Sequence, residues 1–351
     1  MTRIRVLHIP SHIAYVHKLH SHLYSPVTAP GSAPFTIDQL LKLDDWRFFD
    51  VLHLHTVELA SIEQVRLLSA RLRAQCKGLV FTAHDLAPNI EADGKAFQQK
   101  MRLAMRLAHT VITLTTAAVE RINRTADQPR SLCCLPHGSA GRPAGSANNA
   151  PGILAFGALR PNRDFGALVR AWRTLDPVQR PPLRLLLRSV GPADVARNRA
   201  LLTELQTAVR EEPDCTVAVT DTMVAPDELA TWCAQGSVLA LPYRHITHSG
   251  QLELARDLGL AAVAPDAATV RAQLTDTGDE TTPVVWARAS ALASPGEYAG
   301  LLRRAIAVER NDPFDHTGWQ AYREREHREL LDAHARIYKD AKSAATEWNS
   351  I

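Results

Sequence analysis

The sequence predicts an α/β protein with two Rossmann-like domains, each built on a parallel sheet. Short apolar stretches alternate with segments of helical periodicity along most of the 351 residues. Strands that alternate with helices form parallel sheets covered on both faces. Residues 142–151, rich in Pro, Gly and Ala and without periodicity, divide this series in two. The length also exceeds what one core usually supports, so two domains are expected.

The apolar stretches place the strands. The first domain is predicted to hold strands at residues 4–9, 51–55, 78–82, 110–114 and 131–135. The second is predicted to hold strands at residues 153–156, 184–188, 215–219, 238–241, 261–264 and 283–286. A charged helix is predicted after Pro313, over residues 319–342. We therefore expect an N-terminal domain over residues 1–143, a C-terminal domain over residues 150–316 and a terminal helical segment at 317–351.

Charge and hydropathy limit the classes of partner that this protein is expected to bind. No apolar run approaches membrane-spanning length and no signal-peptide core is present, so a cytoplasmic protein is expected. Up to Arg142 the chain has 17 Lys and Arg against 11 Asp and Glu, whereas its total charge is +3, so the first half is the basic one. No basic run is interleaved with aromatic residues, and nucleic acid is therefore not an expected partner. Lys100, Arg102 and Arg106 on an amphipathic helix indicate an anionic acceptor, peripheral contact with an anionic membrane, or simply a solvated helix face.

Residues 238–266 carry the most informative pattern in the chain. A buried strand at 238–241 leads to the turn Ser249-Gly250, and a helix follows that turn. The first amides of a helix lack partners inside it and lie at the positive end of its dipole, so this turn suits a phosphate. Glu253 lies one turn into the helix, where a carboxylate suits the two hydroxyls of a ribose. The pattern indicates a nucleoside diphosphate ligand.

The same segment resembles the donor-binding motif of GT-B glycosyltransferases, in particular the retaining enzymes of family 4. The residues in register with that motif are Pro242, Tyr243, Arg244, Ser249, Gly250, Ala255, Gly259 and Val263. Glu253 matches the second glutamate of the family's E-x7-E pattern, and His245 stands in the place of the first. The resemblance implies a donor site that includes Tyr243, His245, Ser249, Gly250, Gln251 and Glu253. It also implies two domains facing a cleft, with the C-terminal helix packing back on the first domain.

A second segment of the later domain also resembles the family. Residues 156–168 form a strand, a polar loop and a helix start, similar to the family's G-x-x-R-P-Y-K-N segment. Gly157 matches the glycine, Arg160 the arginine and Arg163 the lysine, which implies that the two arginines neutralise the diphosphate leaving group. No lysine occurs between Lys100 and Lys339, so a cation on a diphosphate in this domain has to be arginine. Taken alone, such a loop is more typical of a surface turn.

Histidines dominate the polar side chains of the first domain. His53 and His55 alternate on one face of a strand, where both reach toward one point, so a metal site is the alternative. No carboxylate lies close in sequence to complete a hydrolase-type ligand set, and no metal is expected. Residues 50–55, 82–88 and 135–138 resemble the family's D-x-V-H-x-H, T-x-H-N-x-x-P and P-H-G segments. The resemblance implies that His84 contacts the reacting sugar and that the acceptor side comprises Ser11, Tyr15, His55, His84 and His137.

These observations predict a hexosyl-type glycosyltransferase that uses a nucleotide diphosphate sugar, with UDP favoured. The acceptor is expected to be a hydroxyl of a small molecule, a glycan or a lipid-linked sugar. The resemblance implies retention of configuration and catalytic roles for His84, Arg160 and Arg163, with no metal and no further cofactor. The preference for Arg and Ala over Lys indicates a GC-rich bacterial genome and polysaccharide or natural-product biosynthesis. A nucleotide-sugar epimerase or phosphorylase, or a catalytically silent glycosyltransferase-like partner protein, remains an alternative.

Overall fold

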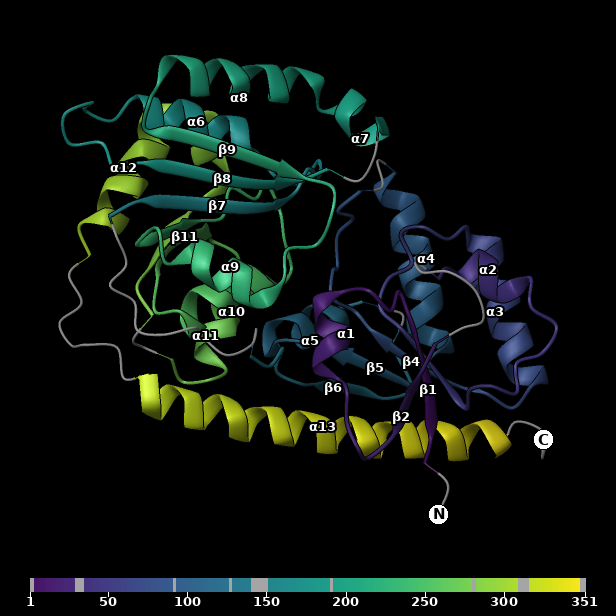
Figure 1. Ribbon diagram of the computed structural model, residues 1–351. Coiled ribbons are helices and arrows are strands. Elements are labelled where there is room, and N and C mark those ends of the chain that lie inside the picture. Colours follow the sequence, from purple (N-terminus) through teal and green to yellow (C-terminus); the bar gives the residue numbers. More distant parts are fainter. Residues whose placement is uncertain are drawn as a thin grey trace. The chain divides into compact units, whose positions relative to one another are not determined.

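The computed structural model describes residues 3–28, 35–90, 93–125, 128–139, 151–189, 192–279, 282–308 and 316–347. The chain divides into two compact units. Unit 1 comprises Met1–Gly138 and Tyr322–Ile351, and unit 2 comprises Ser139–Ala321. The predicted linker at 142–151 lies, apart from Pro151, outside the described residues. Figure 1 shows the strands and helices of both units.

Unit 1 is built on six parallel strands in the order β2-β1-β3-β4-β5-β6. The strands are β1 (Arg5–Ile9), β2 (Ser25–Val27), β3 (Val51–Leu54), β4 (Gly78–Thr82), β5 (Thr110–Thr113) and β6 (Leu132–Cys134). The helices are α1 (Ala14–Lys18), α2 (Ile37–Leu41), α3 (Ile62–Ala74), α4 (Gly94–Leu107), α5 (Thr116–Asn123) and, from Tyr322 onward, α13 (His316–Glu347). Five of the strands were predicted within one or two residues of their bounds, whereas β2 was not predicted.

Alternation along the strands of unit 1 separates two apolar faces. Leu7, Leu52 and Phe81 belong to one core cluster, together with residues of α2, α3 and α4. Val6, Val51, Val80 and Ile112 belong to another, which includes Tyr338 and Ala341 of α13. Gly78 permits this close packing, because a Cβ there would lie 2.8 Å from the Ala341 carbonyl oxygen. The terminal helix therefore covers one face of the unit 1 sheet.

Unit 2 is also built on six parallel strands, in the order β12-β11-β10-β7-β8-β9. The strands are β7 (Ile153–Ala158), β8 (Leu183–Arg188), β9 (Cys215–Thr220), β10 (Val238–Ala240), β11 (Ala261–Pro265) and β12 (Val284–Ala287). The helices are α6 (Phe165–Arg173), α7 (Pro192–Arg197), α8 (Arg199–Glu211), α9 (Pro226–Cys233), α10 (Gly250–Asp257), α11 (Ala268–Thr275), the 3₁₀ helix η1 (Ala289–Ala293) and α12 (Pro295–Ile306). All six strands were predicted.

The two sheets share a property that locates ligand sites. In unit 1, β2 lies on one side of β1 and β3 on the other, so the direction in which strands are added reverses at β1. In unit 2 the order reverses between β7 and β10. Ligands of open parallel sheets bind beyond the carboxyl ends of the strands at such reversals. The α/β class with two parallel sheets is confirmed, and each sheet has a position where a site is expected. None of the helices in the described ranges is both long enough and apolar enough to span a membrane.

Candidate functional site

In unit 2 the loops after β7 and β10 meet at the strand-order reversal. Arg163 and Tyr243 form an isolated antiparallel bridge between the two loops. The Arg163 guanidinium donates to the Tyr243 hydroxyl at 2.7 Å and to the Phe156 carbonyl at 3.3 Å, and it lies 4.8 Å from the centre of the Tyr243 ring. Gln251, at the start of α10, bonds the same hydroxyl at 3.2 Å and the same carbonyl at 2.6 Å. Four predicted donor residues, Gly157, Arg163, Tyr243 and Gln251, therefore form one cluster, which we call the Arg163 cluster.

Gly157 is the backbone element that makes room for this cluster. Its φ is +126°, a conformation that side-chain-bearing residues rarely adopt. A Cβ at this position would lie 1.6 Å from Arg163 Nη1 and 2.8 Å from Gln251 Nε2. The sequence resemblance matched Gly157 to the glycine of the family's segment, and in this structure the group that lies against it is the Arg163 side chain.

A third arginine belongs to the same region and was not predicted. Arg188 ends β8, and its carbonyl accepts from the Leu159 amide at 2.9 Å, directly before Arg160. Burial lowers the pKa of Arg188, and the positive charges of Arg160 and Arg163 lower it further. Three guanidinium groups thus concentrate positive charge at the carboxyl ends of β7 and β8. The available signal was an arginine at the carboxyl end of a predicted strand beside the loop that carries Arg160.

The predicted phosphate turn is the start of α10. Ser249 caps the helix, since its hydroxyl accepts from the Leu252 amide at 3.2 Å. Gln273 of α11 fixes the Ser249 backbone through bonds to its amide at 2.8 Å and its carbonyl at 3.0 Å. Ser249 is buried, so its side chain positions the turn, while Gly250 is exposed. Among the first amides of α10, those of Gly250 and Gln251 are the ones for which helix geometry provides no acceptor.

Glu253 lies in a buried ionic network. The side chain is 4% exposed, and its two oxygens accept from Arg256 at 3.1 Å and from Gln273 at 2.9 Å. Arg256, fully buried, also donates to Asp279 at 2.8 Å and to the Thr277 hydroxyl at 2.6 Å. A carboxylate has further lone pairs for a ribose hydroxyl. The ribose contact of Glu253 therefore stays a prediction, and the network gives this residue a structural role in addition.

His245 lies on an exposed loop. Its carbonyl accepts from Asn162 at 3.3 Å, while the neighbouring Arg244 forms an ion pair with Asp164 at 2.8 Å. Both contacts tie the loop after β10 to the loop after β7. The predicted donor role of His245 stays a prediction. His248, which sequence analysis did not select, lies 3.6 Å from Glu253.

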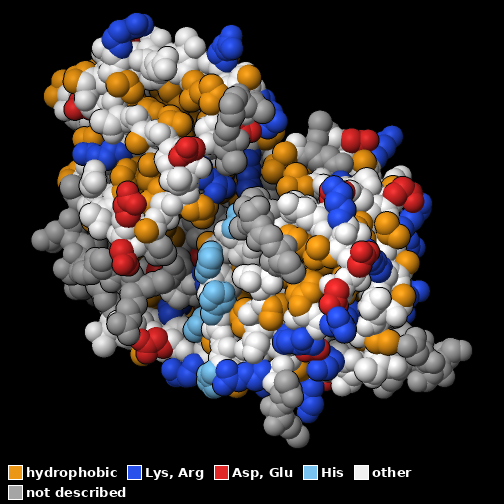
Figure 2. Space-filling view, turned by 45° about the vertical axis from the view of Figure 1, so that its right-hand side comes forward, with side chains coloured by type: hydrophobic (Ala, Val, Ile, Leu, Met, Phe, Trp, Pro, Cys, Tyr) orange, Lys and Arg blue, Asp and Glu red, His pale blue; other side chains and the backbone are white. Residues whose placement is uncertain are grey.

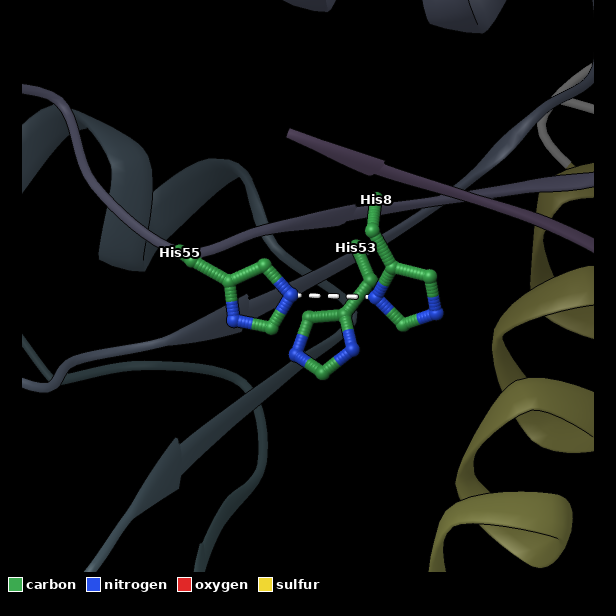
Figure 3. A group of neighbouring side chains, drawn as sticks. All are labelled: His8, His53 and His55. Carbon is green, nitrogen blue, oxygen red and sulfur yellow. Dashed lines mark hydrogen bonds between the residues drawn. The ribbon is translucent and has the colours of Figure 1, made fainter. Parts of the chain in front are cut away.

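In unit 1 the histidines gather where β1 and β3 end. His8 of β1 pairs in register with His53 of β3, and both project to the face covered by α13. His53 bonds the Tyr338 hydroxyl of α13 and the Thr82 hydroxyl of β4, both at 2.7 Å. His8 Nδ1 lies 3.0 Å from His55 Nε2, as Figure 3 shows. His55 and the loop after β4 continue this arrangement, since His55 Nδ1 lies 3.2 Å from His84 Nε2.

Burial keeps these imidazoles neutral. His8, His53 and His55 are at most 3% exposed. Burial lowers the pKa of His8 to about 3, and it lowers the pKa values of His53 and His55 well below the usual range. His334 of α13 is also buried, with its pKa lowered by burial to about 4. Neutral rings donate and accept hydrogen bonds without carrying charge, which suits the binding of hydroxyl groups.

Sequence analysis gave a metal site at His53 and His55 as an alternative. In the structure His8 lies close to both of them. Their ring nitrogens lie within 4.8 Å of one another. Each is a ligand type that Zn²⁺ accepts. Several of these nitrogens already have hydrogen-bond partners. Both nitrogens of His53 bond hydroxyl groups, and His8 Nδ1 and His55 Nε2 bond each other. A metal ion would have to displace these hydrogen bonds, and the absence of a functional metal stays a prediction.

The other predicted acceptor-side residues surround His84. Tyr15 is 3% exposed and meets the His84 ring edge to face, with centroids 4.7 Å apart. His137 lies 5.3 Å from the Tyr15 ring, and its Nδ1 is 2.8 Å from the Lys18 ammonium. Ser11 is partly exposed in the loop after β1. His84 and His137 are half-buried. Figure 2 shows that some histidine side chains of the molecule reach the surface. His334 and Tyr338 of α13 were not predicted as members of this region.

The basic helix predicted as an anion or membrane surface needs a correction. Lys100 of α4 is 5% exposed, and its ammonium donates to the carbonyls of Glu58 at 3.1 Å and Ala60 at 2.8 Å. It holds the loop after β3 instead of facing solvent. Arg102 and Arg106 are exposed, as is Lys95 in the first turn, so the surface charge of this helix comes from those three residues.

No protein-family model matches the sequence, and no curated protein matches it. Solved structures do. HepE from Anabaena, solved with UDP and glucose, superposes with a TM-score of 0.57 at 13% identity, over 89% of this chain and 76% of that one. Sucrose-phosphate synthase from Thermosynechococcus elongatus gives 0.54 at 16% identity, over 87% and 74%. The trehalose 6-phosphate synthase of Burkholderia multivorans gives 0.53 at 14% identity, over 86% and 72%. The chain is similar to these proteins in fold, and that fold is GT-B.

Proposed function

We propose that this protein is a glycosyltransferase that moves a hexosyl group from a nucleotide diphosphate sugar, with UDP favoured, to an acceptor hydroxyl. The main support is the concentration of Arg160, Arg163 and Arg188 beside the start of α10, at the strand-order reversal of unit 2. Guanidinium groups and helix-terminal amides both bind phosphate oxygens. Similarity in fold to HepE, solved with UDP and glucose, supports the same ligand class.

The division of labour between the units is part of this proposal. Unit 2 binds the donor, and the loops at the carboxyl ends of β1, β3 and β4 in unit 1 bind the acceptor, whether a small molecule, a glycan or a lipid-linked sugar. In the transfer step, the bond from the anomeric carbon to the phosphate oxygen breaks and the acceptor oxygen forms the new bond. The acceptor proton passes to the leaving phosphate, and the arginines stabilise the charge that develops there. This route retains configuration and requires no metal.

Ligand binding is the first test. Thermal shifts with UDP, GDP, ADP and dTDP should show the largest increase in melting temperature with UDP, because a ligand of the native state stabilises it by mass action. The variant Arg163→Ala should lose most of that shift, whereas Arg210→Ala, an exposed arginine on α8, should keep it. Equal shifts in both variants would remove the Arg163 cluster from the donor site.

Product analysis separates the alternative activities. Appearance of the sugar on a second molecule supports transfer, whereas an isomerised nucleotide sugar identifies an epimerase and a sugar phosphate identifies a phosphorylase. Donor binding with neither transfer nor slow donor hydrolysis identifies a silent partner protein, an alternative favoured by His245 in place of the usual acid. Transfer should also survive treatment with a chelator. Loss of activity that divalent ions restore would overturn the metal-independent route.

A further inference from the structure

Three imidazoles of unit 1 form a single hydrogen-bonded chain. His8 Nδ1 meets His55 Nε2 at 3.0 Å, and His55 Nδ1 meets His84 Nε2 at 3.2 Å. His55 therefore uses both ring nitrogens within the chain. The chain runs from a fully buried residue of β1 to a half-buried residue in the loop after β4. We call these three residues the histidine chain.

Neutrality restricts where the protons of the histidine chain lie. Burial holds His8 and His55 in the neutral form. A neutral imidazole has one N–H and one bare nitrogen, so His55 donates to one neighbour and accepts from the other. Only two proton arrangements satisfy both hydrogen bonds, and they run in opposite directions. In one, His84 Nε2 accepts from His55; in the other, His84 Nε2 donates to it.

The buried end of the chain selects between the two. Among the residues that the structure describes, none offers a hydrogen-bond partner to His8 Nε2, which is buried. If the chain ran from His84 toward His8, this nitrogen would carry a proton, and a buried donor would have no acceptor. In the opposite direction the same nitrogen is bare. Buried donors without acceptors are the rarer case in folded proteins, whereas under-satisfied acceptors are better tolerated.

We infer that His8 and His55 act as positioning residues that fix His84 in the tautomer protonated on Nδ1. In this arrangement His8 Nδ1–H donates to His55 Nε2, and His55 Nδ1–H donates to His84 Nε2. The lone pair of His84 is thus engaged inside the protein, and its polar hydrogen is on Nδ1. His53 is outside the chain: its bonds to Tyr338 and Thr82 hold its ring 4.1 Å from the His55 ring and restrict how His55 turns.

The tautomer determines what His84 offers a ligand. A ring protonated on Nδ1 donates a hydrogen bond to an oxygen, and its engaged Nε2 does not take a proton from an acceptor hydroxyl. His84 therefore orients a sugar oxygen instead of serving as a general base. This step rests on the proposed function, whereas the tautomer itself does not.

The tautomer is measurable without any ligand. Long-range ¹H–¹⁵N correlation spectra of the full chain with ¹⁵N-histidine, at pH 7.5, distinguish a protonated from a bare ring nitrogen by chemical shift. His84 is expected to show a protonated Nδ1 and a bare Nε2, and His55 likewise. A protonated Nε2 on His84, or averaged shifts for its two nitrogens, would overturn the inference. This outcome is independent of whether the protein transfers sugars.

Two variants of matched shape test the direction. Asn and Asp place their terminal atoms near the position of His8 Nδ1. His8→Asn keeps a donor, so the His84 tautomer should stay as in the wild type. His8→Asp supplies an acceptor, so His55 should donate to it from Nε2 and the His84 proton should move to Nε2. His17→Gln, an exposed histidine outside the chain, is the control. An unchanged His84 spectrum in folded His8→Asp, with His55 nitrogen shifts that show a neutral ring, would contradict the inference.

Transfer assays then test the consequence. His8→Asp should lower turnover on the order of tenfold, with His8→Asn and His17→Gln close to the wild type. Wild-type turnover in His8→Asp with a reversed His84 tautomer would show that the direction of the chain is irrelevant to the ligand. If the wild type itself transfers no sugar, the proposed function fails, while the spectra still decide the tautomer.

Discussion

The two units have similar six-stranded parallel sheets, but the polar groups at their carboxyl ends differ in kind. Unit 1 places buried neutral imidazoles there, linked to one another and to Tyr338 and Thr82. Unit 2 places arginines there, together with the start of α10. Neutral donors and acceptors suit hydroxyl groups, and guanidinium groups suit phosphates. One architecture thus provides two chemically distinct sites through the residues that follow its strands.

Acid should affect the two units differently, and this is the largest expected effect. The pKa of folded His8 is about 3 and that of His334 about 4, with His53 and His55 also lowered. Below pH about 6.5 the unfolded chain takes up protons that these folded residues do not. The stability they provide is present above that pH and is lost as the pH falls toward 3. For each pH unit below about 6.5, one such histidine lowers the free energy of unfolding by up to about 1.4 kcal/mol. The four together lower it by roughly 5 kcal/mol per pH unit.

Hydrogen exchange resolved by peptides, corrected for the intrinsic effect of pH, measures this difference. Protection should fall between pH 7 and 5 in peptides of unit 1 more than in those of unit 2, because His8, His53, His55 and His334 belong to unit 1. The control His17→Gln should leave the profile unchanged. An equal loss of protection in both units would break the comparison.

The buried charge of unit 2 gives the next effect. Arg256→Met leaves Glu253 and Asp279 buried without their cation, so the free energy of unfolding should fall by about 3–5 kcal/mol. The matched control is Arg271→Met, whose ion pair with Asp266 is partly exposed and should contribute about 0–1 kcal/mol. Urea denaturation compares them. A variant at position 256 as stable as the control would show that the network does not support unit 2.

Catalysis sharpens the comparison. Arg163→Ala removes a cation that stabilises the leaving phosphate, and transfer should lose about 3 kcal/mol of transition-state stabilisation, on the order of a hundredfold in turnover. Steady-state kinetics with saturating donor measures it. Arg210→Ala should retain wild-type turnover. If the two variants behave alike, the chemistry of unit 2 does not depend on the Arg163 cluster.

The smallest effect concerns Glu253. If its carboxylate accepts from ribose hydroxyls, Glu253→Ala should weaken nucleotide binding by about 1.5–3 kcal/mol, at least roughly tenfold, and spare the 2′,3′-dideoxy analogue. Calorimetry with both ligands cancels any general damage to the buried network, because that damage affects both equally. Equal losses for the two ligands, or no loss for either, would assign Glu253 to the network alone.

Most strands were predictable because buried parallel strands are continuous apolar runs. The missed strand β2 is Ser25–Val27, a three-residue edge strand containing a proline, and it has no such run. The Arg163 cluster could be predicted in part, since the turn at Ser249 and the loop after Gly157 have local patterns. The contacts of Arg163 could not be predicted, because its partner Tyr243 lies 80 positions away and the two residues meet only where two loops come together.

Two further differences have physical reasons. Tyr338 bonds His53 from 285 positions away in the sequence, and His334 packs near the same ring. The sequence of a charged helix does not indicate which of its turns packs against the strands. Lys100 was predicted as a surface cation from its charge. Its spacing from Phe97, Met101 and Ala104 instead places it on the buried face of α4, where backbone carbonyls bind its ammonium. Helical position was the better indicator here.

The absence of lysine between Lys100 and Lys339 has a practical consequence. Every lysine of the sequence falls within unit 1, at positions 18, 42, 77, 95, 100, 339 and 342, whereas unit 2 contains arginine but no lysine. An amine-reactive fluorophore or cross-linker that targets lysine side chains will therefore label unit 1 and leave unit 2 unmodified. A lysine-specific protease will keep residues 101–339 in one fragment. The chain thus allows the two units to be marked chemically without engineered tags.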